Sequence, residues 1–433
     1  MTMTKHNVFL LSLGCSKNTV DSERLMAQAE ASGITFTETA DEADTILINT
    51  CAFIEDAKEE SIAETLAAIG KKTEGKVQRV YMMGCLTELY RKELHEEMEE
   101  VDGFFGTREL PEVLAALGAV YREEFYDRRS LLTPPHYAYL KIAEGCNRAC
   151  SFCSIPKIRG RYISQPPEQL LREAALLKSA GVRELNVIAQ DISLYGYDLE
   201  GKSLLNDLVL RLSDMEFDWI RLFYAYPVGF PLEVIDTMHE RANICNYLDI
   251  PLQHGNDRIL RSMNRGINKA ETIKLIETIR EKNPDIRLRT TMIAGYPGET
   301  REEFEELLQF VEESRFDRLG CFPYCHEEHA PSFKLEESLT MEEKRERVAE
   351  LMELQESISA ENNRVFEGKT IKVLIDQIEA DTALGRTEYD APEVDNECIL
   401  DLNNQPVTVG SFCMAEITDS GAYELHGRVI EIL

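Results

Sequence analysis

Short apolar runs alternate with helical patterns along most of this chain, and this alternation restricts the possible folds more than any other feature. From residue 1 to about 132, the runs at 8–14, 45–49 and 80–84 each precede a stretch with the spacing of a helix. A strand–helix–strand order aligns successive strands in parallel, because the helix returns the chain to the same end of the sheet. The first part of the sequence therefore predicts a doubly wound parallel α/β domain.

A second, longer alternation follows Pro134 and Pro135. These two residues interrupt helix and sheet, because proline fixes φ and has no backbone N–H. Six strand–helix units after them are typical of a partial (β/α)6 barrel. The expected strands lie at 137–144, 184–190, 219–226, 247–253, 287–294 and 318–324.

The last part of the chain has a different pattern. An acidic helical stretch from Met341 to about Val365 closes the central alternation, and short β-rich runs such as 370–375 and 428–433 follow Gly368. These runs predict a small antiparallel β-barrel. We therefore expect three domains, at residues 1–132, 133–365 and 366–433.

The chain has 11 cysteines, and no export signal precedes the apolar run at 8–13. An odd number of cysteines without an export signal makes a disulfide framework a poor explanation, and thiolates that bind metal a better one. No stretch has the roughly 18 to 20 uninterrupted apolar residues of a membrane-spanning helix. We expect a cytoplasmic protein with no membrane partner.

Three cysteines are close in sequence, because only three and two residues separate Cys146, Cys150 and Cys153. One tight loop can present thiolates at this spacing to one face of an iron–sulfur cube, whose fourth iron then has no protein ligand. An open iron can bind a small molecule, whereas an electron-transfer cluster normally has four cysteine ligands. The alternative is a structural zinc loop, but no second cysteine pair lies at an obvious distance.

The motif Cys-x-x-x-Cys-x-aromatic-Cys after the first strand of a barrel resembles the signature of the radical S-adenosylmethionine superfamily. The resemblance implies a [4Fe-4S] cluster at which an electron cleaves S-adenosylmethionine to methionine and a 5′-deoxyadenosyl radical. It also implies that later strand ends hold this cofactor, although a polar strand end or a plain turn would explain the same residues. The residues assigned to the cofactor in this way are Phe152, Gln190, Asp191, Arg289, Ile293 and Gly295.

Three further cysteines, Cys15, Cys51 and Cys85, each end an expected strand of the first domain. Parallel strands bring their carboxyl ends to one edge of a sheet, where helix N-termini stabilise negatively charged thiolates. A second three-cysteine cluster site would fit this edge. The alternative is packing alone, because buried cysteine behaves as a small hydrophobic residue.

A second resemblance extends over essentially the whole chain. The stretch Ser12-Leu13-Gly14-Cys15, followed by Lys17-Asn18, together with the central motif and the small β-rich tail, is similar to the methylthiotransferase family. The resemblance implies a second [4Fe-4S] cluster at Cys15, Cys51 and Cys85, whose open iron carries an exchangeable sulfur that is methylated and passed to a substrate radical. It also implies two S-adenosylmethionine molecules per product and an electron donor such as a flavodoxin or ferredoxin. It assigns no catalytic acid or base.

The remaining cysteines have no motif of this kind. We expect Cys245, Cys398 and Cys413 to be packing residues. A third metal site is a weaker alternative, because its two cysteines lie in one apparent strand. The family usually has a small hydroxyl residue and a glycine in this region, so this sequence departs from the family pattern here, and the departure leaves the cluster ligands untouched. The residues that would form it are Cys321, Cys325, His326 and His329.

The charge of the tail bears on the substrate. The family divides chiefly between enzymes that modify adenosine in transfer RNA and a branch that modifies an aspartate of small-subunit ribosomal protein twelve. The tail resembles a TRAM domain, which grips RNA in the RNA-modifying branches and needs a basic face for it. Residues 366–433 contain four Lys or Arg and fourteen Asp or Glu, and the whole chain has a net charge of -31. This tail should repel RNA and attract a very basic protein.

We therefore expect methylthiolation of the β-carbon of that aspartate, on the ribosomal protein either free or on the ribosome, without strong direct RNA binding. The stretch at 144–160, with Ser154 and Lys157, is similar to the same branch. Two alternatives stay open: methylthiolation of modified adenosine in transfer RNA, and a non-catalytic iron–sulfur protein that senses redox state. The acidic tail could also serve solubility alone, because the other two domains are acidic too.

Overall fold

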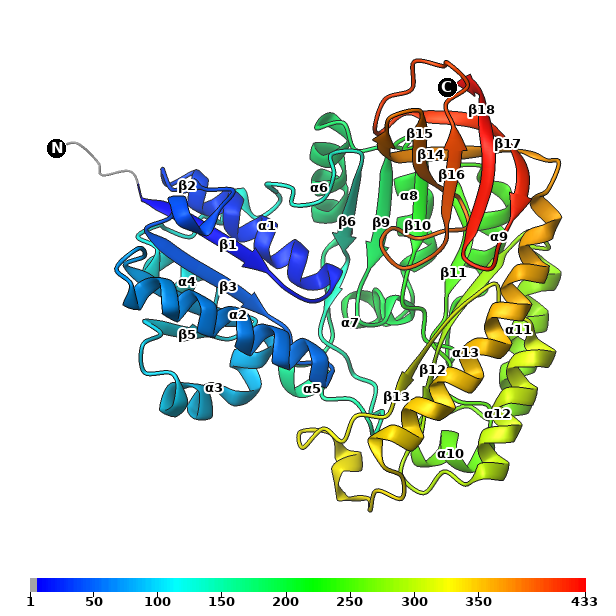
Figure 1. The fold of residues 1–433 in the computed structure, drawn as a ribbon, viewed down its shortest axis with the longest axis horizontal. Coiled ribbons are helices and arrows are strands. Elements are labelled where there is room, and N and C mark those ends of the chain that lie inside the picture. Colours follow the sequence, from blue (N-terminus) through cyan, green and yellow to red (C-terminus); the bar gives the residue numbers. More distant parts are fainter. Residues whose placement is uncertain (1–5) are drawn as a thin grey trace.

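The structure is a computed structural model that describes residues 6–433. Three β-sheet units follow one another along the chain (Figure 1): an N-terminal sheet, a central open barrel and a closed C-terminal barrel. No helix within these residues is long and apolar enough to cross a bilayer.

The N-terminal sheet has five parallel strands in the order β2-β1-β3-β4-β5. Helices α1 and α4 cover one apolar face of the sheet, and α2 and α3 cover the other. The predicted doubly wound domain is therefore confirmed, although the short edge strands β2 and β5 were not expected. The elements are β1 (Asn7–Ser12), α1 (Ser16–Glu30), β2 (Thr35–Phe36), β3 (Thr45–Thr50), α2 (Glu55–Thr73), β4 (Arg79–Gly84), α3 (Cys85–Glu97), β5 (Gly103–Phe105) and α4 (Leu110–Ala116).

The central unit is a sheet of six parallel strands in the order β13-β12-β11-β10-β9-β6. Its first and last strands do not pair, so the barrel is open and the predicted partial (β/α)6 architecture is confirmed. The strands are β6 (Tyr137–Lys141), β9 (Glu184–Ile188), β10 (Trp219–Leu222), β11 (Ile244–Asp249), β12 (Arg287–Ala294) and β13 (Arg318–Pro323), with a small hairpin of β7 (Ala143–Glu144) and β8 (Ile163–Ser164) after β6.

Helices cover the outside of the central sheet and bury its main apolar core. The helices α11, α12 and α13 each begin with a capping box, in which Asn268, Thr300 or Thr340 exchanges hydrogen bonds with a glutamate three residues later. The helices are α5 (Ile155–Ile158), α6 (Pro167–Ser179), α7 (Tyr197–Glu200), α8 (Leu205–Ser213), α9 (Glu233–Glu240), α10 (Asp257–Ser262), α11 (Lys269–Lys282), α12 (Arg301–Ser314) and α13 (Met341–Asn363).

The C-terminal unit is a closed five-stranded barrel in the order β14-β15-β16-β18-β17. Its pairs are antiparallel except for β16 and β18, which run parallel, so the predicted small barrel is confirmed with one parallel pair in it. Cys398 and Cys413 are buried in its core, as expected of packing residues. The strands are β14 (Thr370–Glu379), β15 (Thr382–Thr387), β16 (Glu397–Asp401), β17 (Phe412–Ser420) and β18 (Glu424–Ile432).

The C-terminal barrel packs against the starting ends of the central strands (Figure 1). Arg221 on β10 is fully buried there, where it pairs with Glu184 at 2.9 Å and donates to the carbonyl oxygen of Glu388 at 2.6 Å. Arg318 at the start of β13 pairs with Asp390 at 2.6 Å. The opposite, carboxyl ends of the central strands stay free of the tail, and they carry the cysteine loop described next.

Candidate functional site

Three thiols of the N-terminal unit lie at the carboxyl edge of adjacent strands. Cys15 is the N-cap of α1 after β1, Cys51 directly follows β3, and Cys85 is the first residue of α3 after β4. The strands β1, β3 and β4 are neighbours, so the structure brings the three residues together. A Cβ on Gly14 would lie 2.7 Å from the Cβ of Cys51, so a glycine at this position allows the two segments to pass closely.

The surroundings of these thiols combine burial with positive charge. Burial raises the pKa of the Cys85 thiol to about 12, even though the Arg159 guanidinium opposes the rise. Burial also raises the pKa of Cys51. Arg159 Nη2 lies 3.8 Å from Cys85 Sγ and donates to the side chain of Asn18. The thiolates would therefore form when a metal replaces their protons, and Arg159 and the N-terminal ends of α1 and α3 would stabilise them.

The second set of thiols lies in the loop between β7 and α5. The backbone N–H of Arg148 donates to Cys146 Sγ at 3.3 Å, and Arg265 Nη1 donates to Cys150 Sγ at 3.2 Å. Burial raises the pKa of Cys146 to about 11 and that of Cys153 to about 12. This loop, like the first edge, offers hydrogen-bond donors to thiolates that burial alone would keep protonated.

Two arginines surround Tyr226 beside this loop. Their guanidinium carbons lie 4.0 Å (Arg148) and 4.3 Å (Arg265) from the centre of the Tyr226 ring. The Tyr226 hydroxyl lies 3.9 Å from Cys150 Sγ and donates to the carbonyl oxygen of Arg265 at 2.6 Å. The Tyr226 ring and the two guanidinium groups over it form a wall next to Cys150, in which Arg148 is also paired with Asp191. The positive charge of this wall suits both a thiolate and the carboxylate of an amino-acid ligand.

The donor sets fit an iron–sulfur cube better than a single ion. Among residues 6–433, no group of three His, Cys, Asp or Glu side chains converges closely enough to hold one metal ion. Thiolates on a single zinc ion, each with a bond of about 2.3 Å, must lie within about 4 Å of one another. A cube bound at three corners takes thiolates that are close but farther apart, and each set has three cysteines near one another.

Four of the residues assigned to the cofactor by resemblance lie near the Cys146–Cys153 loop. Asp191 pairs with Arg148 at 2.7 Å, and Gln190 donates to Glu144 at 3.1 Å. Phe152 and Ile293 both pack against the apolar cluster around Met263 and Tyr296. The structure thus brings these side chains to one end of the barrel, while their contact with the cofactor stays a prediction.

The other two assigned residues lie on or after β12. Arg289 is held by Asp249 at 3.3 Å and by Asp395 of the C-terminal unit at 3.2 Å. Gly295 has φ of +76°, and its backbone N–H donates to the Glu299 carboxylate at 3.1 Å. Arg289 is therefore already paired with two carboxylates, and its role at the cofactor also stays a prediction.

Buried charges join the two cysteine regions. Arg159 pairs with Asp21 of α1 at 2.5 Å, and Lys141 at the end of β6 pairs with Asp21 and, at 2.6 Å, with Glu144. Burial by itself raises the pKa of the Asp21 carboxyl, but Lys141 and Arg159 outweigh it and hold that pKa at about 2. This charge network fixes the N-terminal sheet against the open edge of the barrel.

Two of the residues named for a third metal site have packing contacts. Cys321 packs against the main core, and the ring of His329 lies 4.9 Å from that of Tyr90 on α3. The weaker alternative of a third metal site at Cys321, Cys325, His326 and His329 stays a prediction. Cys245 is buried inside the barrel beside Tyr247, as expected of a packing residue.

No sequence pattern indicated three residues of the site: Arg159, Arg265 and Tyr226. Arg265 lies 115 residues from Cys150, and Arg159 lies 74 residues from Cys85. Local spacing carries no information on contacts at such separations. The position of Arg159 six residues after the last cysteine of the motif is the one local feature that could have indicated it.

Three family descriptions match the chain. The radical SAM superfamily matches residues 140–311, the Uncharacterized protein family UPF0004 matches residues 7–106, and the TRAM domain matches residues 368–430. These ranges correspond to the central sheet, the N-terminal sheet and the C-terminal barrel. The two cysteine sets fall in the first two ranges.

Two curated relatives illustrate the similarity over full length. A protein of Pelodictyon phaeoclathratiforme (strain DSM 5477 / BU-1), called ribosomal protein uS12 methylthiotransferase RimO, is 78% identical over 431 residues that span 100% of both chains. A protein of the same name from Chlorobaculum tepidum (strain ATCC 49652 / DSM 12025 / NBRC 103806 / TLS) is 72% identical over 98% of both chains.

Solved structures share the fold at low identity. The radical S-adenosylmethionine methyltransferase TsrM from Kitasatospora setae superposes with a TM-score of 0.56 at 15% identity, over 76% of this chain and 77% of that one. The cobalamin-dependent enzyme OxsB gives a TM-score of 0.50 at 13% identity, over 81% of this chain and 56% of that one.

Proposed function

The chain belongs to the family of ribosomal protein uS12 methylthiotransferases called RimO, and from this premise we propose which of its residues carry out the reaction and on which substrate. It is a radical S-adenosylmethionine enzyme that transfers a methylthio group, and [4Fe-4S] clusters and S-adenosylmethionine are its cofactors. We propose that the acceptor is the β-carbon of an aspartate of uS12. When bound, the cofactors supply the electron, the radical and the sulfur.

The residues of this chain bind and orient those groups. Cys146, Cys150 and Cys153 would hold one cluster, and Arg265 and the backbone N–H of Arg148 would stabilise two of the three thiolates. The guanidinium groups beside Tyr226 would attract the carboxylate of S-adenosylmethionine. Phe152 and Ile293 offer it apolar contact, and Gln190 and Asp191 offer polar contact.

The second cluster would be held by Cys15, Cys51 and Cys85. Arg159 is positioned to stabilise the Cys85 thiolate and, through Asp21, to keep this edge of the sheet fixed against the barrel. The single observation that carries the proposal is this geometry: three thiols at one sheet edge, joined by buried charges to a barrel whose loop carries three more.

The charges of the C-terminal barrel favour a protein acceptor over RNA. Three of the four basic residues in 366–433 are already engaged: Arg386 pairs with Glu184, Arg428 pairs with Glu416, and Lys372 lies 4.2 Å from the centre of the Phe412 ring. A unit with fourteen Asp and Glu residues and so few free cations does not suit a phosphate backbone. We therefore propose a cytoplasmic enzyme that acts on uS12, free or on the ribosome, with a flavodoxin- or ferredoxin-like electron donor.

We also propose domain limits at 1–132, 133–365 and 366–433. The change from the N-terminal sheet to the barrel at Pro134 and Pro135, and the end of α13 at Asn363, support these limits. Each unit has its own apolar cluster, which is the physical mark of a domain.

The direct test is anaerobic turnover. The reconstituted enzyme is given reductant, sulfide and S-adenosylmethionine, and uS12 and bulk transfer RNA are offered separately. We expect mass spectrometry to find the methylthio group on an aspartate peptide of uS12. A methylthio group on adenosine would instead support the RNA-modifying alternative, and failure to cleave S-adenosylmethionine would support the non-catalytic one.

Single cysteine substitutions separate the roles of the two sets. We expect Cys150→Ala to abolish cleavage of S-adenosylmethionine to 5′-deoxyadenosine, because its cluster loses one of three ligands. We expect Cys51→Ala to retain cleavage and to lose methylthio transfer. Buried Cys245→Ala is the matched control, and it should retain both activities. If Cys51→Ala still transfers sulfur to uS12, the assignment of the second cluster is wrong.

A further inference from the structure

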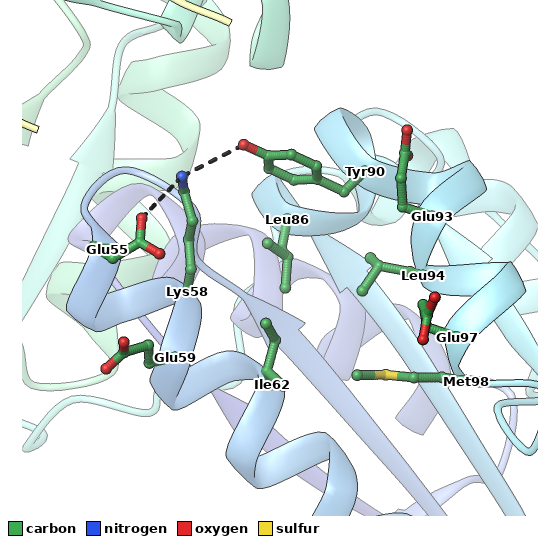
Figure 2. Close-up of a pocket in the computed structure, with 10 residues that line it drawn as sticks. All are labelled: Glu55, Lys58, Glu59, Ile62, Leu86, Tyr90, Glu93, Leu94, Glu97 and Met98. Atoms are coloured by element: carbon green, nitrogen blue, oxygen red, sulfur yellow. Dashed lines mark hydrogen bonds and ion pairs between the residues drawn. The ribbon is translucent and has the colours of Figure 1, made fainter. Parts of the chain in front are cut away.

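A groove runs between α2 and α3 on the N-terminal unit (Figure 2). It lies near the sheet edge with Cys51 and Cys85, because its lining residue Leu86 directly follows Cys85, and the Cys51 N–H donates to the hydroxyl of Ser61, next to the lining residue Ile62. Its volume is about 450 Å³. The floor is apolar, and it is part of the same apolar cluster as Cys85. The residues of the floor are Ile62, Leu86, Leu94 and Met98.

Carboxylates from both helices surround this floor. Glu55 and Glu59 lie on the α2 side and Glu93 and Glu97 on the α3 side, and all four are exposed (Figure 2). Glu55 is 3.4 Å from Lys58. Within residues 6–433 the other three form no ion pair, so the rim keeps a net negative charge.

One end of the groove meets the barrel. Lys58 pairs with Glu327 at 2.5 Å, and the Tyr90 hydroxyl donates to the same carboxylate at 2.9 Å. Glu327 lies in the segment after β13, at the carboxyl ends of the barrel strands. This end of the groove therefore lies at a junction between the N-terminal unit and the segment after β13, and that segment also contacts the Cys146–Cys153 loop, because the Ser332 N–H donates to the carbonyl oxygen of Ser151 at 2.7 Å.

We propose that this groove binds a basic, amphipathic segment of the substrate protein uS12 and so holds the acceptor residue near the junction. Lysine or arginine side chains of the segment would lie against the four glutamates, and its apolar side chains would cover the floor. A protein that binds RNA phosphates carries an excess of such cations, whereas RNA itself would be repelled by the rim. The proposal rests on the function proposed above and adds the surface by which uS12 is recognised.

The test compares a variant with two reversed charges on the rim of the groove and a control variant with two reversed charges outside the groove. The rim variant is Glu59→Lys with Glu97→Lys. The control is Glu64→Lys with Glu96→Lys, which changes the same charge on the same two helices at exposed positions that do not line the groove. Binding of purified uS12 to each reconstituted holoenzyme is measured by isothermal titration calorimetry, together with kcat and KM for methylthio transfer.

We expect the rim variant to raise the Kd and KM for uS12 by about tenfold or more, with kcat much less affected, because lost charge complementarity weakens binding without touching the reacting groups. The control should change the Kd by no more than about twofold. Equal weakening in both variants would mean that the overall charge acts, and no weakening in the rim variant would mean that uS12 binds elsewhere. Either result would contradict the proposal that uS12 binds in this groove.

A separate readout distinguishes this proposal from the proposed function. If the unaltered enzyme cleaves S-adenosylmethionine but neither binds nor modifies uS12, the proposed substrate is wrong and the groove proposal fails with it. If the unaltered enzyme and the rim variant both bind and modify uS12 equally well, the function stands and only the groove proposal fails.

Discussion

Arg159 connects the chemistry of the site to the stability of the fold. Its side chain is 2% exposed, and it contacts Asn18, Asp21 and the sulfur of Cys85 from the far side of a unit boundary. A buried guanidinium at this place needs all its partners, because a charge taken out of water costs several kcal/mol unless it is paired. Arg159 therefore acts as a positioning residue for the N-terminal sheet edge.

Removal of this guanidinium should destabilise the protein. We expect Arg159→Met to lower the free energy of unfolding by about 1.5–3 kcal/mol, because it removes the charged hydrogen bonds to Asp21 and Asn18 and leaves the partly buried Asp21 carboxylate with Lys141 alone. The control is Arg241→Met, since the exposed pair of Arg241 with Asp214 at 2.9 Å is worth about 0–1 kcal/mol. Urea titrations of the metal-free variants give both values, and equal losses would contradict the role of Arg159.

Asp21 should make stability depend on pH in acid. Its pKa is about 2 in the folded protein against an ordinary value of 3.8, so ionised Asp21 favours the folded state above pH 4. This contribution, about 2 kcal/mol, is lost as the pH falls from about 4 to about 2. We therefore expect Asp21→Asn to destabilise the protein more at pH 5 than at pH 2.

Chemical denaturation at the two pH values checks this expectation. The exposed Asp56→Asn on α2 is the matched control. A destabilisation by Asp21→Asn that does not vary with pH would mean that the hydrogen bonds of Asp21, and not its charge, hold the edge.

The residues around the site differ in how well local sequence predicts them. Cys146, Cys150 and Cys153 are predictable because one short loop contains them all. The prediction that Cys15, Cys51 and Cys85 lie together also required the rule that parallel strands end at the same edge of a sheet. The adjacent strands β1, β3 and β4 satisfy this rule. Arg265 and Tyr226 reach Cys150 only through tertiary packing, so no spacing could indicate them.

At the scale of elements, the long buried strands are predictable from the sequence, and the short strands at the edges of the sheets are not. The strand β3 is buried along its whole length, and its centre is the continuous apolar run 46–48. The strand β2 has two residues, which is too short for any periodicity. The parallel pairing of β16 with β18 depends on closure of the barrel, and closure is decided by contacts distant in sequence.

The elements of the tail are fastened to the barrel by buried ion pairs. We expect Asp390→Asn to weaken this contact by about 3–5 kcal/mol, because it leaves the Arg318 guanidinium buried without its counter-charge. Hydrogen exchange should then speed up in β14–β18 and stay unchanged in β1–β5. Arg428→Met, which removes the exposed pair with Glu416, is the control and should leave exchange in both units unchanged.

In the whole molecule, the two ends of the central barrel contact different units. The tail covers the ends where the strands begin, through contacts such as Trp219 with Phe412 at 4.7 Å between ring centres. The N-terminal sheet adjoins the ends where the strands finish, through the charge network around Asp21. The acidic groove and both cysteine regions thus share one side of the molecule, and the tail lies at the other.

The spacing of the two cysteine sets also affects how the protein matures. Cys146 and Cys153 are seven residues apart, so the chain between them closes at low entropic cost even when the surrounding structure is loose. Cys15 and Cys51 are 36 residues apart, and Cys51 and Cys85 are 34 apart, so these thiols meet only in the finished sheet. With the cluster ligands proposed above, iron could therefore be captured at the first set before folding is complete, whereas the second set could be loaded only after residues 7–105 have folded. Partial unfolding of the N-terminal sheet alone would leave a protein able to cleave its cofactor and unable to deliver sulfur.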